Sequence, residues 1–136
     1  MAESMSVTTS PFDDHVGVVV VSATPEKVVA TLDIDPARHT QPYGVVHGGV
    51  YATMAETVAS IGSFLVAHQF GRVTMGLENH TSFLRAIRGG RVTATAVPVS
   101  AGRRTQVWDV SMTSDEGAVV ARSTVRLIAV EPRSEV

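Results

Sequence analysis

The alternation of apolar and polar positions divides the chain into short strand-like runs on either side of one long helical segment. Residues 15–22 and 27–34 are rich in β-branched side chains and are separated by a short segment containing Pro25, so we predict two strands joined by a turn. Two prolines and a glycine interrupt residues 35–46. Such residues break regular elements, and this segment is therefore predicted to be a long loop.

One helix is predicted between Gly48 and Gly71, an interval without proline. Its apolar residues recur at steps of three and four, which is the spacing of one helix face; they are Val50, Met54, Val58, Ile61 and Leu65. The helix would have about six turns. Its single formally charged side chain is Glu56, and a helix so poor in charge is expected to be enclosed by other parts of the molecule.

Beyond Gly71 the pattern changes to that of strands. Four runs rich in Val, Thr and Ile are separated by turns that contain glycine; the runs are residues 73–84, 91–100, 105–113 and 118–130. We expect these four strands to be linked in succession by hairpins. Two strands, a long helix and four strands predict an α+β fold, in which an antiparallel six-stranded sheet buries the apolar stripe of the helix.

A chain of 136 residues is long enough for one domain with a single core. The Ser/Thr-rich amino terminus lacks the basic start and apolar run of a secretory signal. We therefore expect residues 1–11 to be a flexible tail and residues 12–133 to form one domain. Glu56, His68 and Gln69 make the helical interval costly to place in a membrane. These features indicate a cytoplasmic protein with no membrane partner.

The formal net charge of -2 and the lack of a basic run argue against a nucleic-acid partner. The absence of cysteine excludes disulfides, thiolate metal sites and a cysteine nucleophile. The histidines show no metal-ligand spacing, so no metal is expected. A hydrophobic content of 44% against 18% charged residues indicates that oligomerisation covers some apolar surface.

Paired glycines, Gly48 and Gly49, open the predicted helix. The first N–H groups of a helix have no partners within it and carry the positive end of its dipole, so they can hold a developing oxyanion. An ordinary glycine-containing helix start is the alternative. Gln41 lies in the loop, six residues before His47, and its amide can donate a hydrogen bond to a carbonyl.

Glu56 and Ser60 lie one turn apart on the same helix face. Ser60 can orient a water or the carboxylate, although a helical serine often bonds to its own main chain, and Glu56 can equally face solvent. Glu56 follows Gly48 by eight residues, which corresponds to about 12 Å along the axis. If both groups act on one bond, Glu56 must come from a second chain, as a two-fold dimer allows.

The order Gln41, His47-Gly48-Gly49 and Glu56, followed by the run Asn-His-Thr-Ser-Phe-Leu-Arg at residues 79–85, resembles the hotdog-fold thioesterase superfamily. The likeness is to its phenylacetic-acid-degradation-type branch, and within that to the glutamate-type 4-hydroxybenzoyl-CoA and 1,4-dihydroxy-2-naphthoyl-CoA thioesterases. It spans residues 12–133. The resemblance implies a hotdog fold, hydrolysis of an acyl-CoA without a cofactor, and a homodimer that pairs into a homotetramer.

The resemblance also implies a role for each residue of the motif. The N–H of Gly48 forms the oxyanion hole at the thioester carbonyl, and Gln41 polarises that carbonyl or contacts the bound group. Glu56 of the partner subunit acts as a nucleophile or as a general base on water. Ser60 assists the carboxylate or the water. His47 orients the loop or contacts the sulfur side.

Cations near the mouth of the site would hold the phosphates of coenzyme A. The resemblance places Arg85 and Arg133 at such positions and lets the ligand approach closely at Gly49. Arg103 and Arg104 lie on a turn where the family commonly has Ser or Thr, so their role stays open. Solvated edge arginines are the alternative for all four.

Two other functions fit parts of the same pattern. One is a hotdog dehydratase or hydratase acting on acyl thioesters, which would pair a catalytic His with an acid on the helix. The other is a non-catalytic acyl-CoA-binding protein. The His47-Gly48-Gly49 pattern fits the thioesterase better than the dehydratase, and the presence of Gln41, Gly48 and Glu56 together argues against a non-catalytic protein. The resemblance favours an aromatic acyl group.

Overall fold

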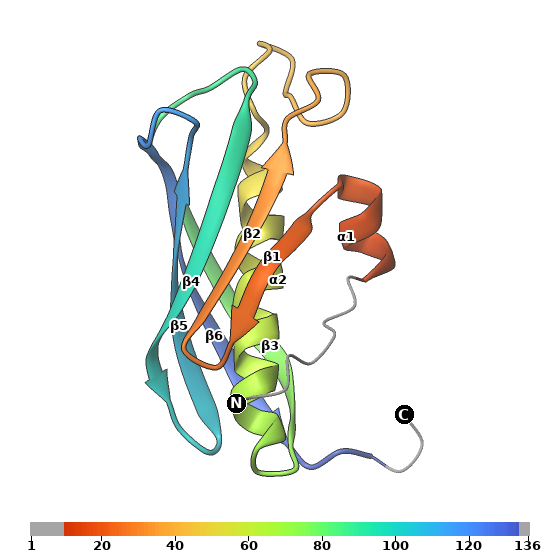
Figure 1. Ribbon diagram of the computed structural model, residues 1–136, viewed down its shortest axis with the longest axis vertical. Helices are drawn as coiled ribbons and strands as arrows, with labels where there is room; N and C mark the ends of the chain where they lie inside the picture. Colours follow the sequence, from red (N-terminus) through yellow and green to blue (C-terminus); the bar gives the residue numbers. More distant parts are fainter. Residues whose placement is uncertain (1–9, 134–136) are drawn as a thin grey trace.

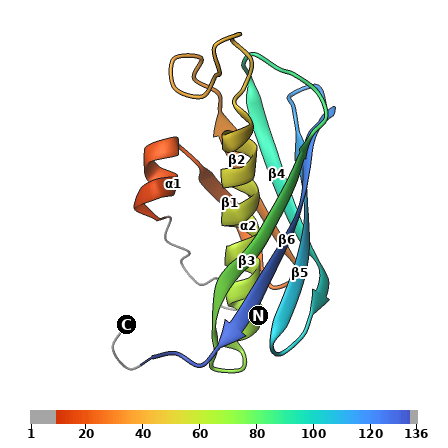
Figure 2. The same cartoon turned by 180° about the vertical axis from the view of Figure 1, so that it is seen from behind.

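The computed structural model describes residues 10–133, whose six strands form one antiparallel sheet in the order β1-β2-β4-β5-β6-β3. The strands are β1 (Val19–Thr24), β2 (Lys27–Asp33), β3 (Val73–Phe83), β4 (Arg91–Ala101), β5 (Thr105–Thr113) and β6 (Val119–Val130). The sheet wraps around the long helix α2 (Gly48–His68), as Figures 1 and 2 show from opposite sides. The predicted α+β architecture is confirmed.

The expectation that the last four strands follow one another as hairpins is wrong for β3. This strand pairs with β6 at one edge of the sheet, whereas β4 pairs with β2. The seven residues between β3 and β4 are too many for a tight turn and are anchored elsewhere. The Ile87 carbonyl accepts from the Val46 N–H at 2.8 Å, and Arg88 donates to the Tyr43 carbonyl at 2.9 Å. The connection is thereby held at the start of α2.

The predicted strand over residues 15–22 is also wrong at its beginning, because the short helix α1 (Pro11–Val16) occupies that part of the chain. Ser10 caps α1 by accepting from the Asp13 N–H at 3.1 Å, and Gly17 ends it with a φ of 101°. Residues 1–9 of the predicted tail lie outside the described residues, but Ser10 and Pro11 belong to this helix and its cap.

Helix α1 is fastened to α2 through a buried carboxylate. Asp13 is 6% exposed, accepts a hydrogen bond from the Thr57 hydroxyl and accepts another from the Ser10 hydroxyl at 2.8 Å. A buried carboxylate requires such donors. In Figure 1, α1 lies beside α2, on the side opposite to β4, β5 and β6.

The core fills the space between α2 and the concave face of the sheet. Trp108 is fully buried there, and a Cβ built on Gly62 would stand 2.4 Å from its ring. Its indole N–H donates to Gln106 at 2.8 Å, and Gln106 donates in turn to the Ser63 carbonyl at 3.1 Å. Helix and sheet are therefore in close contact at mid-length.

Among the described residues, α2 is the one helix that is long and apolar enough to cross a membrane, with a mean hydropathy of 1.4 in its most apolar window. Central helices of soluble proteins meet the same criterion. Of that window, 56% is buried inside the molecule, as expected for a helix enclosed by a sheet.

Candidate active site

The first turn of α2 presents a free backbone donor. His47 caps the helix: its Nδ1 accepts from the Gly49 N–H at 2.8 Å, and its carbonyl accepts from the Val50 N–H at 3.0 Å. The Gly48 N–H donates to no residue within the described part of the chain. This N–H lies at the positive end of the helix dipole and can therefore bind a carbonyl oxygen that gains negative charge.

Phe83 covers the other side of Gly48. A Cβ at position 48 would stand 2.5 Å from the Cζ atom of the Phe83 ring, so only glycine allows this approach. The ring of Phe83 lies 6.2 Å from that of Tyr51 between centroids and keeps 60% of its surface exposed. An exposed aromatic face thus adjoins the free donor.

Gln41 lies in the loop that precedes the helix. Its side-chain oxygen accepts from the Tyr43 N–H, which leaves the two amide hydrogens available to a ligand. The loop is closed by a bond from the Gln41 N–H to the Val45 carbonyl at 2.9 Å and by Arg88 on Tyr43. The chain therefore holds Gln41, His47 and Gly48 in one rigid loop and helix start.

Glu56 lies two turns farther along α2 and contacts β3. Its Oε2 accepts from the Asn79 side chain at 3.1 Å, and a Cβ at Gly76 would stand 2.4 Å from its Oε1. The axial separation from Gly48 is about 12 Å, so a single chain does not bring the two groups together. Ser60 is half-buried, and no hydrogen bond in the described structure joins it to Glu56.

Two residues that hold this region were missed from the sequence. Asn79 was part of the recognised run, but its contact with Glu56 depends on which side of β3 it faces. Arg88 fixes the loop of Gln41 from 45 positions away. A basic residue in a connection between strands gives no signal of such a contact.

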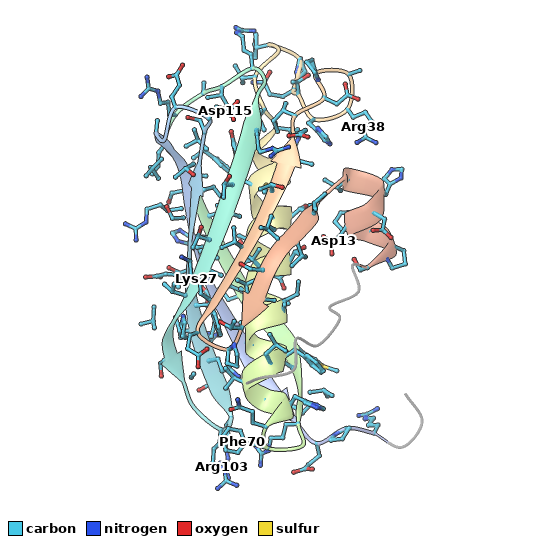
Figure 3. The ribbon with its side chains drawn as sticks, in the orientation of Figure 1. Asp13, Lys27, Arg38, Phe70, Arg103 and Asp115 are labelled. Atoms are coloured by element: carbon cyan, nitrogen blue, oxygen red, sulfur yellow. The ribbon has the colours of Figure 1, made fainter. Side chains whose placement is uncertain are left out.

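The four arginines are divided between the two ends of the molecule. Arg85 is exposed and follows β3, where its N–H donates to the Val120 carbonyl at 3.2 Å. Arg103 lies at the opposite end of α2, with its guanidinium 5.7 Å from the ring centroid of Phe70 (Figure 3). Arg104 is next to it, and Arg133 is exposed beyond β6.

A cleft of about 580 Å³ opens between α1, the loop before α2 and the first turns of α2. Its wall includes Phe12, Val16, His47, Gly49 and Thr53. The cleft thus adjoins the residues on both sides of Gly48.

His39, which also lines the cleft, serves the fold. It is 3% exposed; its Nδ1 accepts from the Asp35 N–H at 2.8 Å, so its Nε2 carries the hydrogen that is donated to the Val16 carbonyl at 2.7 Å. This pairing fixes one neutral tautomer. Residues 10–133 contain no group of three His, Cys, Asp or Glu side chains that could hold a metal ion.

Comparison with known proteins gives a consistent result. Residues 43–121 match the thioesterase superfamily. The chain is 43% identical to Rv1847 of Mycobacterium tuberculosis, which carries the provisional name of an esterase. The alignment of 127 residues covers 92% of this chain and 90% of that protein. The proofreading thioesterase EntH of Cronobacter sakazakii is 32% identical over 104 residues, 76% of this chain and 74% of that one.

Solved structures of relatives have the same fold. The Rv1847 structure has a TM-score of 0.88 at 42% identity, covering 91% of this chain and 99% of that chain. The thioesterase HI1161 of Haemophilus influenzae has a TM-score of 0.82 at 32% identity, covering 88% and 82% respectively.

Proposed function

The chain belongs to the thioesterase superfamily and has its hotdog fold, and from this premise we propose that it hydrolyses an acyl-CoA, with aromatic acyl groups preferred. The observation that carries the proposal is the unpaired N–H of Gly48 at the positive end of α2. Members of the family named thioesterases support hydrolysis of a thioester. The resemblance of Gln41 and Glu56 to the aryl-CoA subgroup supports the choice of substrate.

The complete site requires two chains. Strand β3 is eleven residues long and lies at the edge of the sheet, so its outer backbone groups are available to pair. Met75 and Leu77 on this strand are 61% and 49% exposed. An edge of this kind favours pairing with a second copy of β3 about a two-fold axis.

The contacts of β3 also indicate the register. Residues opposite each other on an antiparallel pair face the same side, and both Phe83 and Gly76 face α2, against Gly48 and Glu56 respectively. Leu77 is the extra residue of a β-bulge in β3, so it has no partner in this pairing. Pairing Phe83 with the partner's Gly76 then places the two-fold axis at His80. Gly48 of one subunit then lies beside Glu56 of the other.

In this arrangement the substrate carbonyl accepts from the Gly48 N–H and the Gln41 amide. As a nucleophile, the partner's Glu56 attacks the carbonyl carbon, the C–S bond breaks, the thiolate of coenzyme A leaves, and water then hydrolyses the mixed anhydride. As a general base, it takes a proton from the water that attacks directly. Both routes yield the free acid and coenzyme A. His47 holds the start of the helix, and Ser60 can orient the attacking water.

We place the acyl group in the cleft beside Gly49 and the coenzyme A arm along α2. From Glu56 to His68 the helix rises about 18 Å, a distance that an extended pantetheine arm spans. At that end Arg103 and Arg104 can hold phosphates, with Arg133 nearby and Arg85 at the other end of the site. Guanidinium groups bind phosphate through paired hydrogen bonds.

The test is thiol release from benzoyl-, hydroxybenzoyl-, dihydroxynaphthoyl-, phenylacetyl- and fatty acyl-CoA. Glu56→Ala is expected to lower kcat by about 10²- to 10⁴-fold, and a Glu56→Ala variant with near-normal hydrolysis contradicts the proposal. Water addition to crotonyl-CoA without thiol release would identify a hydratase. Binding of these esters without turnover would identify a non-catalytic protein.

Mixing two impaired variants, each defective in a different half of the site, tests the shared site directly. Glu56→Ala and Gly48→Ala chains, unfolded together and refolded, form hybrids with one intact site. Random pairing restores about a quarter of the wild-type activity. Failure to restore activity in confirmed hybrids excludes a site built from two chains. The mass of the wild-type protein in solution tests the dimer and the expected homotetramer together.

A further inference from the structure

The carboxylate of Glu56 is held by β3. The Asn79 side-chain amide donates to Glu56 Oε2 and to the Ala52 carbonyl, both at 3.1 Å. The other oxygen, Oε1, lies against Gly76, where a Cβ would stand 2.4 Å away. Strand β3 therefore positions both oxygens of this carboxylate: Asn79 donates to Oε2, and the missing side chain of Gly76 leaves room for Oε1.

A β-bulge makes this double contact possible. Gly76 and Asn79 are three positions apart, and in a regular strand residues at that spacing face opposite sides. Here the register shifts between Gly76 and Glu78, so that Gly76 is opposite Leu127 and Asn79 is opposite Val125. Both partners on β6 are buried in the core. The extra residue, Leu77, turns Gly76 and Asn79 toward α2.

Two hydroxyl groups fix the orientation of the Asn79 amide. Thr81 donates to Asn79 Oδ1 at 2.6 Å, which directs the amide hydrogens toward Glu56. The single Thr81 proton is thereby used, so Ser123 is the donor in the 2.7 Å bond between their hydroxyls. Ser123 is 5% exposed. The donors run in one direction, from Ser123 through Thr81 and Asn79 to the carboxylate.

We propose that Asn79 is a positioning residue for Glu56, held in its donating orientation by Thr81 and Ser123. The proposal rests on the proposed function, because it assigns the carboxylate a defined geometry for attack or for proton transfer. A hydrogen bond to a charged acceptor is among the stronger ones in proteins. Without it the Glu56 side chain gains rotamers in which it no longer faces the partner's site.

The first variants each remove the polar group of one side chain while keeping its approximate shape. Asn79→Leu is expected to lower kcat by about 10- to 100-fold with little change in KM. Thr81→Val replaces a hydroxyl with a methyl on a strand that favours β-branched residues, so it keeps the fold even if Asn79→Leu does not. It is expected to lower kcat by a smaller factor. Thr81→Ser keeps the hydroxyl and is expected to retain wild-type kcat.

The double variant separates positioning from a general loss of stability. If Thr81 acts through Asn79, the Asn79→Leu and Thr81→Val effects on kcat are not additive. Additive effects, or a folded Asn79→Leu dimer with wild-type kcat, would overturn the proposal. A rise in KM with kcat unchanged would show that Asn79 contacts substrate and would overturn it as well. Solution mass and unfolding temperature are measured for every variant.

Glu56→Ala in the same assay separates this proposal from the function itself. If Glu56→Ala is inactive while Asn79→Leu is fully active, only the positioning role fails. If Glu56→Ala remains active, the catalytic role of Glu56 fails first.

Discussion

The ring of Phe83 rests on Gly48, so closely that a Cβ at position 48 would stand 2.5 Å from the ring's Cζ atom. Real Cβ atoms do not approach a neighbour to that distance. The lack of a side chain at Gly48 thus admits an aromatic ring from β3 beside the N–H that the first helical turn leaves free.

Replacing Gly48 with alanine is expected to lower kcat/KM by at least about 10-fold, because overpacking of this size displaces the ring or the helix start. Since the obstruction is the ring, Phe83→Val in the Gly48→Ala background is expected to recover part of the loss. The measurement is kcat/KM for Gly48→Ala, Phe83→Val and the double variant with one acyl-CoA. A double variant no better than Gly48→Ala alone would show that the ring is not the obstacle.

The close approach of Gly62 to the ring of Trp108 predicts the effect of a substitution on the stability of the fold. Gly62→Ala places a Cβ 2.4 Å from the ring of Trp108, and overpacking of a core costs about 1–3 kcal/mol. The better helix propensity of alanine returns at most about 1 kcal/mol. We therefore expect a lower free energy of unfolding by denaturant. Gln69→Ala, at the exposed C-cap of the helix, is the control and should be nearly neutral. A more stable Gly62→Ala protein would contradict the packing described.

Filling the cleft tests the placement of the acyl group. Thr53→Trp puts a bulky side chain into the cleft wall, and we expect the ratio of kcat/KM for benzoyl-CoA to that for acetyl-CoA to fall by about 10-fold or more. Thr124→Trp adds the same bulk at an exposed position of β6 and serves as the matched control. An unchanged ratio in Thr53→Trp would place the acyl group elsewhere.

An ion pair between β2 and β4 predicts a dependence of stability on pH. Arg91 donates to Asp33 at 2.7 and 3.2 Å, and this hydrogen bond, aided by its charge and opposed by desolvation, holds the pKa of Asp33 below 3.8. Because the pKa of Asp33 is lower in the folded than in the unfolded protein, its ionised carboxylate stabilises the fold at pH values above the unfolded-state pKa. This contribution disappears as the pH falls through the folded-state pKa.

Arg91→Gln is therefore expected to unfold at a slightly lower temperature than the wild type at pH 7, with the gap closing below about pH 4. Both side chains are largely exposed, at 56% and 74%, so the gap should be small and should shrink with salt. Lys27→Gln removes a positive charge from the opposite end of β2 and leaves this pair intact. A gap independent of pH would exclude the ion pair as its cause.

The sequence was sufficient for the elements whose signal is local. The β-branched runs predicted five of the six strands to within one residue, and the steps of three and four predicted α2 with an end about three residues too late. Helix α1 was missed because six residues show no helical period. Its signal was present in Ser10, Pro11 and Asp13, the pattern of a capped helix start.

Pairing between distant strands was not predictable in the same way. Neighbours in sequence were expected to be neighbours in the sheet, but β3 lies beside β6. The contact of Asn79 with Glu56 depends on that pairing and on a one-residue bulge. The spacing of residues in the sequence thus predicted the loop and the helix start of the candidate site. It did not predict the groups that hold the Glu56 carboxylate.

The neighbourhood of β3 and β6 also sets an order of events during synthesis. A ribosome releases β3 and α2 well before β6, with two hairpin strands made in between. Until β6 arrives, β3 has both of its edges unpaired and its apolar side chains in water, the condition in which nascent chains aggregate or recruit chaperones. The support behind Glu56 is complete only when β6 docks, because Ser123, the donor to Thr81, lies on β6.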